Sequence, residues 1–406
     1  MDYVLTHATL IDGSGRDPIA DAALWVREGR IAWAGAVVNL PAEARRAPEQ
    51  DVSGRTIIPG LIDAHVHVCW NGRESVLELV KRDRDLIVLE AVKTLRHILA
   101  SGTTTVRDIG GHDYVEMSLR KAINAGFIAG PRMRTSGKVI AMTGGHGYFI
   151  AREADGPDEV RKAAREQIKA GADTIKLMAT GGAATPGQDV MASQFTVEEL
   201  AAAVQAAHAL GRTTATHCHG TGGIKNSVLA GIDSIEHGTY LDEETADMMV
   251  ERGTALVLTL GVANPDLTDV PPAAQAEARR LESVLDTLSK RMRQSVEIAR
   301  EKRVFIGSGS DAGGNPLAPH DFSMARELEL LVDHGFSALE ALSIVTHNNA
   351  RILRWDNDLG TLEAGKLADF VVLSADPLDH ISNVRAVEAV YQGGVCVWPP
   401  ADRHLL

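Results

Sequence analysis

The chain has 406 residues, of which 45% are apolar and 23% are charged, the ordinary composition of a globular protein. Its 41 basic and 54 acidic residues give a net charge of −13, and it has no run of five basic residues, which argues against nucleic-acid or anionic-membrane binding. The three cysteines are too few for a disulfide framework, and no apolar stretch reaches the roughly 20 residues of a membrane helix, so we expect a soluble, cytoplasmic protein.

The two ends of the chain are predicted to form one small β-domain. Residues 1–58 contain short strand-like runs that turn at residues 12–15 and 28–29, before a break at residues 59–60. Residues 359–406 again alternate strand-like runs with turns. We therefore expect a composite β-sandwich domain built from residues 1–58 and 359–406.

Residues 59–358 alternate strand-like runs with helical patterns, in one repeated order. The strand-like runs are residues 57–68, 103–110, 131–137, 173–180, 213–220, 233–238, 255–260 and 303–312. Eight strand–helix pairs predict an α/β fold, a closed (β/α)8 TIM-like barrel. The rival fold, an open doubly wound sheet, would need a glycine-rich phosphate loop at the first helix, and the sequence has none there.

Ligand-type side chains lie near the carboxyl ends of five predicted strands, where barrel enzymes carry their functional residues. His65 and His67 are two residues apart, so the two-residue period of a strand points both rings to one side. The other candidates are Lys176, His217, His237 and Asp311. Each alone could be an ordinary polar residue, and Asp311 in GSDAGG could form an Asx turn. Their shared position at the same end of the barrel favours a metal site.

Lys176 is unusual because it lies inside the apolar strand TIKLM. An ammonium group cannot bind a cation, and burial beside metal ions would be unfavourable. Desolvation lowers the pKa of a lysine, and the neutral amine can add carbon dioxide to form a carbamate whose two oxygens can bridge two metals. The alternative is a buried lysine paired with a carboxylate.

The ordered set of motifs resembles the amidohydrolase superfamily. It consists of His65-Val-His67 after IPGLIDAH, IKLMATGG, THCHG, IEHG, GSDAGG and the tail LGTLEAGKLADFVVL, and it extends over nearly the whole chain. The match is closest to the binuclear branch with a carboxylated lysine, in particular to prolidases, arginine or lysine carboxypeptidases and ochratoxin-degrading amidohydrolases. The resemblance implies a barrel with a β-sandwich formed from both termini.

The resemblance also implies a ligand set for two divalent metal ions. His65, His67 and Asp311 would bind the more buried ion, and His217 and His237 would bind the other. Carboxylated Lys176 and a hydroxide would bridge them, and Asp311 would take the proton of the attacking water and deliver one to the leaving amine. The ligands favour zinc, although manganese, cobalt and iron also suit them.

Four further residues are predicted to contact the substrate. His219 lies on the same strand face as His217, whereas Cys218 points away as a packed thiol. The resemblance places His146 of TGGHG and Tyr240 of EHGTY at the scissile carbonyl or at a substrate carboxylate. Arg107 could bind a carboxylate, with a salt bridge to Asp108 as the alternative.

The predicted reaction is hydrolysis of an amide bond to a C-terminal amino acid in a dipeptide-like or N-acyl-amino-acid substrate. A lactonase, a carbamate hydrolase or a phosphotriesterase could use the same binuclear site. A mononuclear deaminase fits less well, because such enzymes lack the strand-four lysine. A non-catalytic scaffold is a remote alternative, because all six ligand positions are filled.

The shape of the entrance to the predicted site is not expected to match that of prolidase-like relatives in full. The linker IAREAD after MTGGHGYF is short, so the mouth of the site can differ from that of prolidase-like relatives. Residues 262–275, rich in proline and aspartate, are the expected lid. The sequence leaves the oligomeric state open and allows a homo-oligomer.

Overall fold

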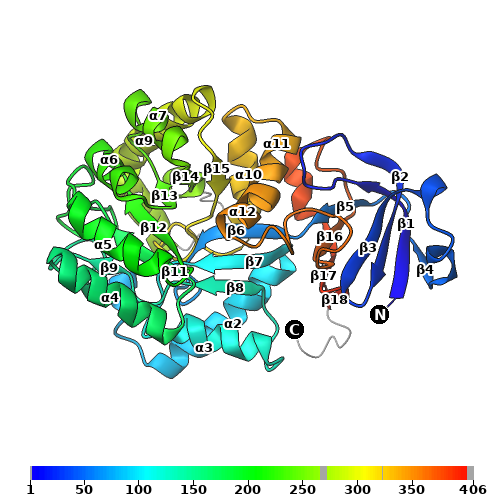
Figure 1. The fold of residues 1–406 in the computed structure, drawn as a ribbon, viewed down its shortest axis with the longest axis horizontal. Coiled ribbons are helices and arrows are strands. Elements are labelled where there is room, and N and C mark those ends of the chain that lie inside the picture. The colour runs from blue at the N-terminus through cyan, green and yellow to red at the C-terminus, as the bar shows by residue number, and fades with distance from the viewer. Residues whose placement is uncertain (1, 266–271, 322, 400–406) are drawn as a thin grey trace.

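The computed structural model describes residues 2–265, 272–321 and 323–399. Figure 1 shows a barrel surrounded by helices, beside a sheet made from both ends of the chain. Among the helices of these described ranges, none combines the length and the apolar character needed to cross a membrane.

The sheet at the chain ends has eight strands. They are β1 (Asp2–Leu10), β2 (Ile19–Arg27), β3 (Arg30–Ala36), β4 (Glu49–Asp51), β5 (Thr56–Pro59), β16 (Phe370–Leu373), β17 (Val387–Gln392) and β18 (Val395–Trp398). The order is β18-β17-β16-β5-β1-β2-β3, with β4 paired to β1. β5 joins the two ends, because it pairs with β1 in parallel and with β16 antiparallel. The predicted boundaries at residues 58 and 359 stay a prediction.

Eight parallel strands form the barrel, and each overlaps a strand-like run of the sequence. They are β6 (Leu61–Val66), β7 (Thr103–Asp108), β8 (Arg132–Thr135), β11 (Thr174–Met178), β12 (Thr213–Cys218), β13 (Ser234–His237), β14 (Ala255–Leu258) and β15 (Ile306–Ser308). β6-β7-β8 and β11 to β15 are two hydrogen-bonded arcs, the second extended by β9 (Ile140–Ala141) and β10 (Arg152–Glu153).

A few hydrogen-bonded contacts join the two arcs at both seams. A parallel bridge links Val66 at the end of β6 to Ala312 just after β15. At the other seam, the backbone N–H of Asp173 donates to the carbonyl of Thr135 at the end of β8. The eight strands therefore follow one another around the barrel in chain order, as the sequence predicted.

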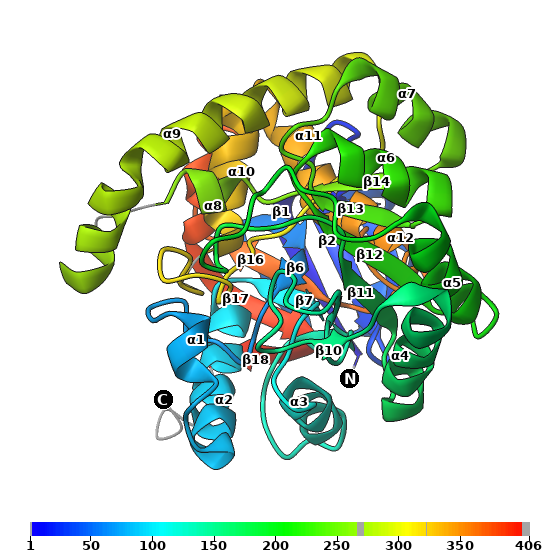
Figure 2. The ribbon, with the colours of Figure 1, turned by 90° about the vertical axis from the view of Figure 1, so that its left-hand side faces the viewer.

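Helices surround the strands (Figure 2). They are α1 (Val76–Leu79), α2 (Arg84–Ala100), α3 (Val115–Asn124), α4 (Gly156–Ala170), α5 (Val197–His208), α6 (Thr221–Ala230), α7 (Glu243–Arg252), α8 (Leu260–Ala263), α9 (Pro272–Glu301), α10 (Ser323–Asp333), α11 (Ala338–Ser343) and α12 (Asn349–Ile352). The short elements are η1 (Val37–Asn39), η2 (Ala44–Arg46), η3 (Ile344–Asn348) and η4 (Ile381–Arg385).

Local signals in the sequence set the bounds of these helices. Thr196 and Glu199 form a capping box that starts α5, an arrangement that contributes about 1 kcal/mol. Gly171 ends α4 in the left-handed conformation, which only glycine adopts without cost. Part of the expected lid, residues 266–271, lies outside the described residues.

β11 shows how the barrel sorts its side chains. Ile175 and Leu177 belong to the buried apolar core that also contains Val160 of α4 and Leu200 of α5. Because side chains alternate along a strand, Lys176 points to the opposite side, into the barrel, where it is 1% exposed. Ile175 and Leu177 therefore pack against the surrounding helices, whereas Lys176 lies in the barrel interior.

Candidate metal centre and active site

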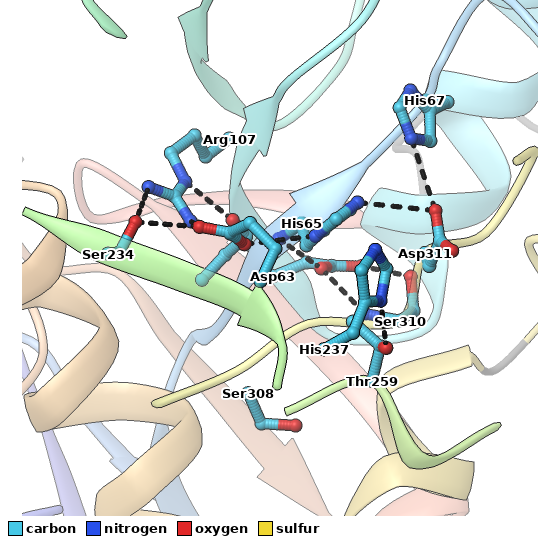
Figure 3. Close-up of polar contacts among 12 residues, drawn as sticks. Asp63, His65, His67, Arg107, Ser234, His237, Thr259, Ser308, Ser310 and Asp311 are labelled. Carbon is cyan, nitrogen blue, oxygen red and sulfur yellow. Dashed lines mark hydrogen bonds and ion pairs between the residues drawn. The ribbon is translucent and has the colours of Figure 1, made fainter. Parts of the chain in front are cut away.

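The ends of β6 and β15 bring two histidines to one carboxylate (Figure 3). Nε2 of His65 lies 3.3 Å from Oδ1 of Asp311, and Nε2 of His67 lies 3.1 Å from the same oxygen. The parallel bridge after β15 holds this arrangement, because the backbone N–H of Asp311 donates to the carbonyl of His65 at 2.7 Å. Three of the six predicted ligands therefore meet at the seam of the barrel.

The far nitrogen of each ring is held by a partner of its own. Nδ1 of His65 lies 2.9 Å from Oε2 of Glu236, and Nδ1 of His67 lies 3.0 Å from the carbonyl oxygen of Gly110. Both partners can only accept, since Glu236 is ionised, so Nδ1 carries the proton in each ring. The neutral rings then present an Nε2 lone pair to Asp311.

Two lone pairs that face a carboxylate attract it only when a positive charge lies between them. A proton or a metal ion can supply this charge, and a divalent ion satisfies both imidazoles and the carboxylate at once. The donor set of His65, His67 and Asp311 therefore fits a metal ion.

His217 and His237 extend the cluster to the neighbouring strands. Nε2 of His217 lies 3.3 Å from the carbonyl oxygen of Gly181, so Nε2 is the protonated nitrogen and Nδ1 is the one left for a metal. Nδ1 of His237 contacts the hydroxyl of Thr259 at 2.7 Å. Burial and neighbouring histidines lower the pKa of both rings well below the ordinary value, which keeps them neutral, as metal ligands must be.

His219 also reaches this part of the cluster. Its Nδ1 lies 2.7 Å from the hydroxyl of Thr239, and ligand atoms of His217, His219 and His237 all lie within 4.8 Å of one another. A second such group consists of His65, His237 and Asp311. The described residues thus form a histidine-rich site that can bind metal. His219 lies beside His217 and His237 in this site.

Strained backbone turns two ligands toward the centre. His237 has φ 71° and Asp311 has φ 51°, both in the left-handed region that side chains other than glycine rarely adopt. Glu236 and His237 are consecutive, and alternation along a strand would point them to opposite sides. Both nevertheless contact the site, because the left-handed residue redirects the chain at the end of β13.

Lys176 lies between these groups with an unpartnered amine. Its Nζ is buried and has no hydrogen-bond partner, which is rare for a buried polar atom. Burial lowers the pKa of Lys176 to about 8, against the opposing charges of Glu236 and Asp311. The alternative of a lysine directly paired with a carboxylate does not match this geometry. An amine that is easily deprotonated and lacks a partner fits carboxylation.

Arg107 is placed differently from the prediction. Its guanidinium is 1% exposed and donates to Glu236 at 2.8 and 3.0 Å, to Ser234 at 3.1 Å and to the carbonyl of Ala64 at 2.6 Å. Because these contacts occupy it beneath the cluster, Arg107 does not reach the cavity and cannot bind a substrate carboxylate there. The salt bridge to Asp108 is also absent, since Glu236 takes its place.

A cavity of about 460 Å³ opens above the cluster. The predicted ligands His65, His67, Lys176, His217, His237 and Asp311 all line it, as do His146 and His219. Tyr240 does not: its side chain lines a different surface cavity, where the guanidinium carbon of Arg291 lies 5.6 Å from its ring centroid. The predicted contact of Tyr240 with substrate therefore does not agree with its position, because the chain turns outward after Gly238.

His146 enters the cavity from the loop after β9 with a defined orientation. The oxygen of Thr185 accepts the N–H of Gly147 at 2.9 Å, and Nδ1 of His146 lies 2.9 Å from the same oxygen. The hydroxyl of Thr185 can donate its proton to Nδ1, and in that arrangement the ring proton of His146 is on Nε2. Burial, with His219 and Lys176 nearby, lowers the pKa of His146 to about 3, so the ring is neutral.

Gly182 allows this ring to approach the ligand strand. A Cβ at this position would lie 2.4 Å from Nε2 of His146 and 2.7 Å from Nε2 of His217, closer than real contacts allow. The two rings are 4.3 Å apart between centroids. Gly182 is therefore required by the close approach of the two histidines.

Several residues that build the site were not singled out from the sequence. Glu236 orients His65 and neutralises Arg107; burial opposes its ionisation, but Arg107 and His65 lower its pKa to about 2. Asp63 accepts from the backbone of Ser310 at 3.0 Å and so holds the strand end before Asp311. A charged residue inside an apolar strand was a usable signal for Asp63 and Glu236, as it was for Lys176.

Known proteins are similar to this chain over most of its length. The model of the amidohydrolase family matches residues 56–397. Ochratoxinase of Aspergillus niger is 30% identical over 428 residues, which cover 96% of this chain and 85% of that protein.

Two solved structures are similar over almost their whole length. An Xaa-Pro dipeptidase with methionine bound in its active site has a TM-score of 0.87 and 30% identity, over 98% of this chain and 99% of that one. A prolidase in complex with N-methylphosphonate-L-proline has a TM-score of 0.84 and 30% identity, over 98% and 99%. With its barrel, its histidine-rich cavity and these relatives, the chain belongs to the amidohydrolase family and is a hydrolase that acts on carbon–nitrogen bonds.

Proposed function

We propose that the protein is a metal-dependent hydrolase that cleaves the amide bond to a C-terminal amino acid, as a dipeptidase, a carboxypeptidase or an N-acyl-amino-acid hydrolase. The observation that carries the proposal is the meeting of five histidine and aspartate ligands with an unpartnered buried lysine in one cavity. The relatives, an ochratoxinase and an Xaa-Pro dipeptidase, support the substrate class.

Two divalent ions would be held in this cavity. His65, His67 and Asp311 would hold one ion, His217 and His237 the other, and carboxylated Lys176 would contribute an oxygen to each. Bound there, zinc ions would lower the pKa of water and polarise the amide carbonyl. The ligand set of nitrogen and oxygen atoms suits zinc.

Asp311 would transfer the protons, and His146 would polarise the carbonyl group of the substrate. Asp311 and Lys176 are the charged side chains among the described residues that line the cavity, so Asp311 is the carboxylate that can accept the proton of the attacking water on Oδ and return it to the leaving amine. The Nε2–H of His146 can donate to the substrate carbonyl oxygen, where negative charge develops. His219 would contact the substrate beside it.

Amine release tests this function. Zinc- or manganese-loaded protein is incubated with separate pools of Xaa-Pro, Xaa-Arg, Xaa-Lys and aromatic dipeptides and with N-acyl amino acids, and the free amino acid is quantified by mass spectrometry. We expect release from at least one pool, abolished by a chelator and by Asp311→Asn. Asp286→Asn, an exposed change on α9, serves as the matched control.

Silence in every pool would contradict the proposed substrate class if the protein holds two metal ions per chain. Lactones, carbamates and phosphotriesters would then be tested with the same loaded protein, since they need the same kind of site. Release that survives the chelator and Asp311→Asn would contradict the proposed site itself.

A further inference from the structure

One wall of the cavity is apolar and comes from the β6 and β15 side of the barrel. Trp70 follows β6, Val76 and Leu77 belong to α1, and Pro316 and Leu317 lie in the loop after β15. Apolar residues of α8 and α9 extend this wall, namely Val262, Val284, Leu285 and Leu288. The atoms that a substrate meets on this side are therefore mostly carbon.

The second wall is also apolar and comes from the β8 to β11 side. Phe149 and Ile150 precede β10, Met178 ends β11, and Ala184 and Pro186 lie in the loop that follows. β15 and β6 meet at one seam of the barrel, and β8 and β11 meet at the other. The two walls therefore belong to different seams of the barrel, and both border the cavity that the histidine cluster also lines.

Charge is confined to the cluster. Among the described residues that line the cavity, Lys176 and Asp311 are the ones with charged side chains, and both belong to the proposed metal centre. Ser75 and Asn315 are neutral, and Oδ1 of Asn315 already accepts the N–H of Leu317. Arg107 donates to Glu236 beneath the site. No described lysine or arginine is thus available in the cavity to pair with a substrate carboxylate.

We infer that the substrate carries an apolar group on each side of the scissile amide and that its recognition does not depend on an ion pair with a carboxylate. This inference rests on the proposed function and narrows its substrate class. A carboxylate buried against these walls, away from the proposed metal ions, is costly, whereas contact with the two walls favours apolar groups. On this inference, the carboxylate of a C-terminal amino acid is not the group that anchors the substrate.

The apolar surface that a substrate buries sets the size of the expected preference for a larger acyl group. Each buried methylene is worth about fourfold in transition-state binding, so the four methylenes that distinguish a hexanoyl from an acetyl group correspond to about 100-fold or more. A cavity that requires a charged or hydrogen-bonding partner instead rejects an analogue without that partner by about 10⁴-fold. These two regimes are far enough apart to be distinguished by kinetics.

The test compares three compounds with zinc-loaded protein. N-hexanoyl-L-leucine has two apolar groups and a carboxylate, N-(3-methylbutyl)hexanamide lacks only the carboxylate, and N-acetylglycine lacks the apolar groups. We expect kcat/KM for N-hexanoyl-L-leucine to exceed that for N-acetylglycine by at least about 100-fold, because the acyl group alone accounts for that factor and the leucine side chain adds to it. We expect the neutral amide to be cleaved within about tenfold of N-hexanoyl-L-leucine. A loss of more than about 100-fold on removing the carboxylate would overturn the inference.

A wall variant with a matched control strengthens the test. Phe149→Ala should reduce the preference for N-hexanoyl-L-leucine over N-acetylglycine by about tenfold, because it removes apolar contact area. The adjacent Tyr148 is 46% exposed and does not line the cavity, so Tyr148→Ala should keep the preference. An equal effect of both variants, or none from Phe149→Ala, would argue against the wall as the source of selectivity.

Failure of the proposed function gives a different result from failure of the inference. If none of the compounds is cleaved, the proposed function fails, and the same compounds are titrated as ligands by calorimetry. Tighter binding of both hexanoyl compounds than of N-acetylglycine would still support the inference. Binding that depends on the carboxylate, or equally weak binding of all three, would overturn it.

Discussion

Nδ1 of His65 lies 2.9 Å from Oε2 of Glu236, and the guanidinium of Arg107 donates to both oxygens of the same carboxylate. Glu236 thus fixes the tautomer of a proposed metal ligand, while a buried arginine from across the barrel keeps Glu236 ionised. Partners of this kind raise the basicity of a ligating imidazole and hold its orientation.

Glu236→Gln should therefore weaken metal binding without removing any ligand. We expect the affinity for zinc to fall by about 10- to 100-fold. The amide of the Glu236→Gln variant would hold the ring of His65 less strongly, and it would no longer favour the tautomer with the proton on Nδ1. Competition with a chromogenic chelator measures this. Glu243→Gln, at an exposed carboxylate that starts α7, is the control. An unchanged zinc affinity in Glu236→Gln would show that this contact does not orient the ligand.

Lys176→Ala should abolish both activity and the binding of two metal ions. The variant loses the only amine of the described cavity that can form a carbamate. Short carboxylic acids should restore part of both properties, because they can supply the two missing oxygens. Metal content by mass spectrometry is read together with activity, and ¹³C-labelled carbon dioxide should give a carbamate signal in the wild type alone. Full activity of the variant would rule out the binuclear arrangement.

Lys176→Met should stabilise the metal-free protein near pH 6.5. Burial lowers the pKa of Lys176 from 10.5 to about 8, so the folded state binds fewer protons than the unfolded state between these values. Wild-type stability therefore rises as pH increases from about 8 to about 10.5, and at lower pH the buried ammonium costs about 3 kcal/mol. The advantage of the variant should shrink over that window.

Urea unfolding of both proteins in chelator and in carbon-dioxide-free buffer measures this difference at pH 6.5 and 9.5. Only the difference between variant and wild type is interpreted, because groups far from Lys176 titrate equally in both. A constant difference across the two pH values would mean that the lysine does not change its protonation with folding.

Thr185→Val should lower kcat more than it raises KM. The hydroxyl of Thr185 lies 2.9 Å from Nδ1 of His146, and by donating to this nitrogen it would favour the tautomer with the ring proton on Nε2. Without it, part of the population has the other tautomer, and we expect a loss of about tenfold in kcat, below the 10²- to 10³-fold cost of deleting such a donor. Thr185→Ser keeps the hydroxyl and should stay close to wild type.

Nitrogen-15 spectra of histidine-labelled protein give an independent reading of this tautomer. The signal absent from His146→Ala identifies the ring, and it should show a protonated Nε2 in the wild type and in Thr185→Ser. Loss of this pattern in Thr185→Val would support the role of the hydroxyl. The same tautomer in all three proteins would contradict it.

The sequence by itself determined the barrel and the proposed ligand positions. The eight strand-like runs and their order are visible because apolar periodicity is local, and the carboxyl ends of parallel strands meet on one side whatever their packing details. For the same reason, His65, His67 and Lys176 could be placed in the cavity from alternation along their strands alone.

The tertiary structure decided what alternation and motif matching could not. Arg107 looked available for substrate until Glu236, 129 residues further along the chain, proved to be its partner. Tyr240 follows a ligand strand but lies in another cavity, because a left-handed turn at His237 and Gly238 redirects the chain. These outcomes depend on contacts between distant strands and on single backbone dihedrals, and neither leaves a periodic signal in the sequence.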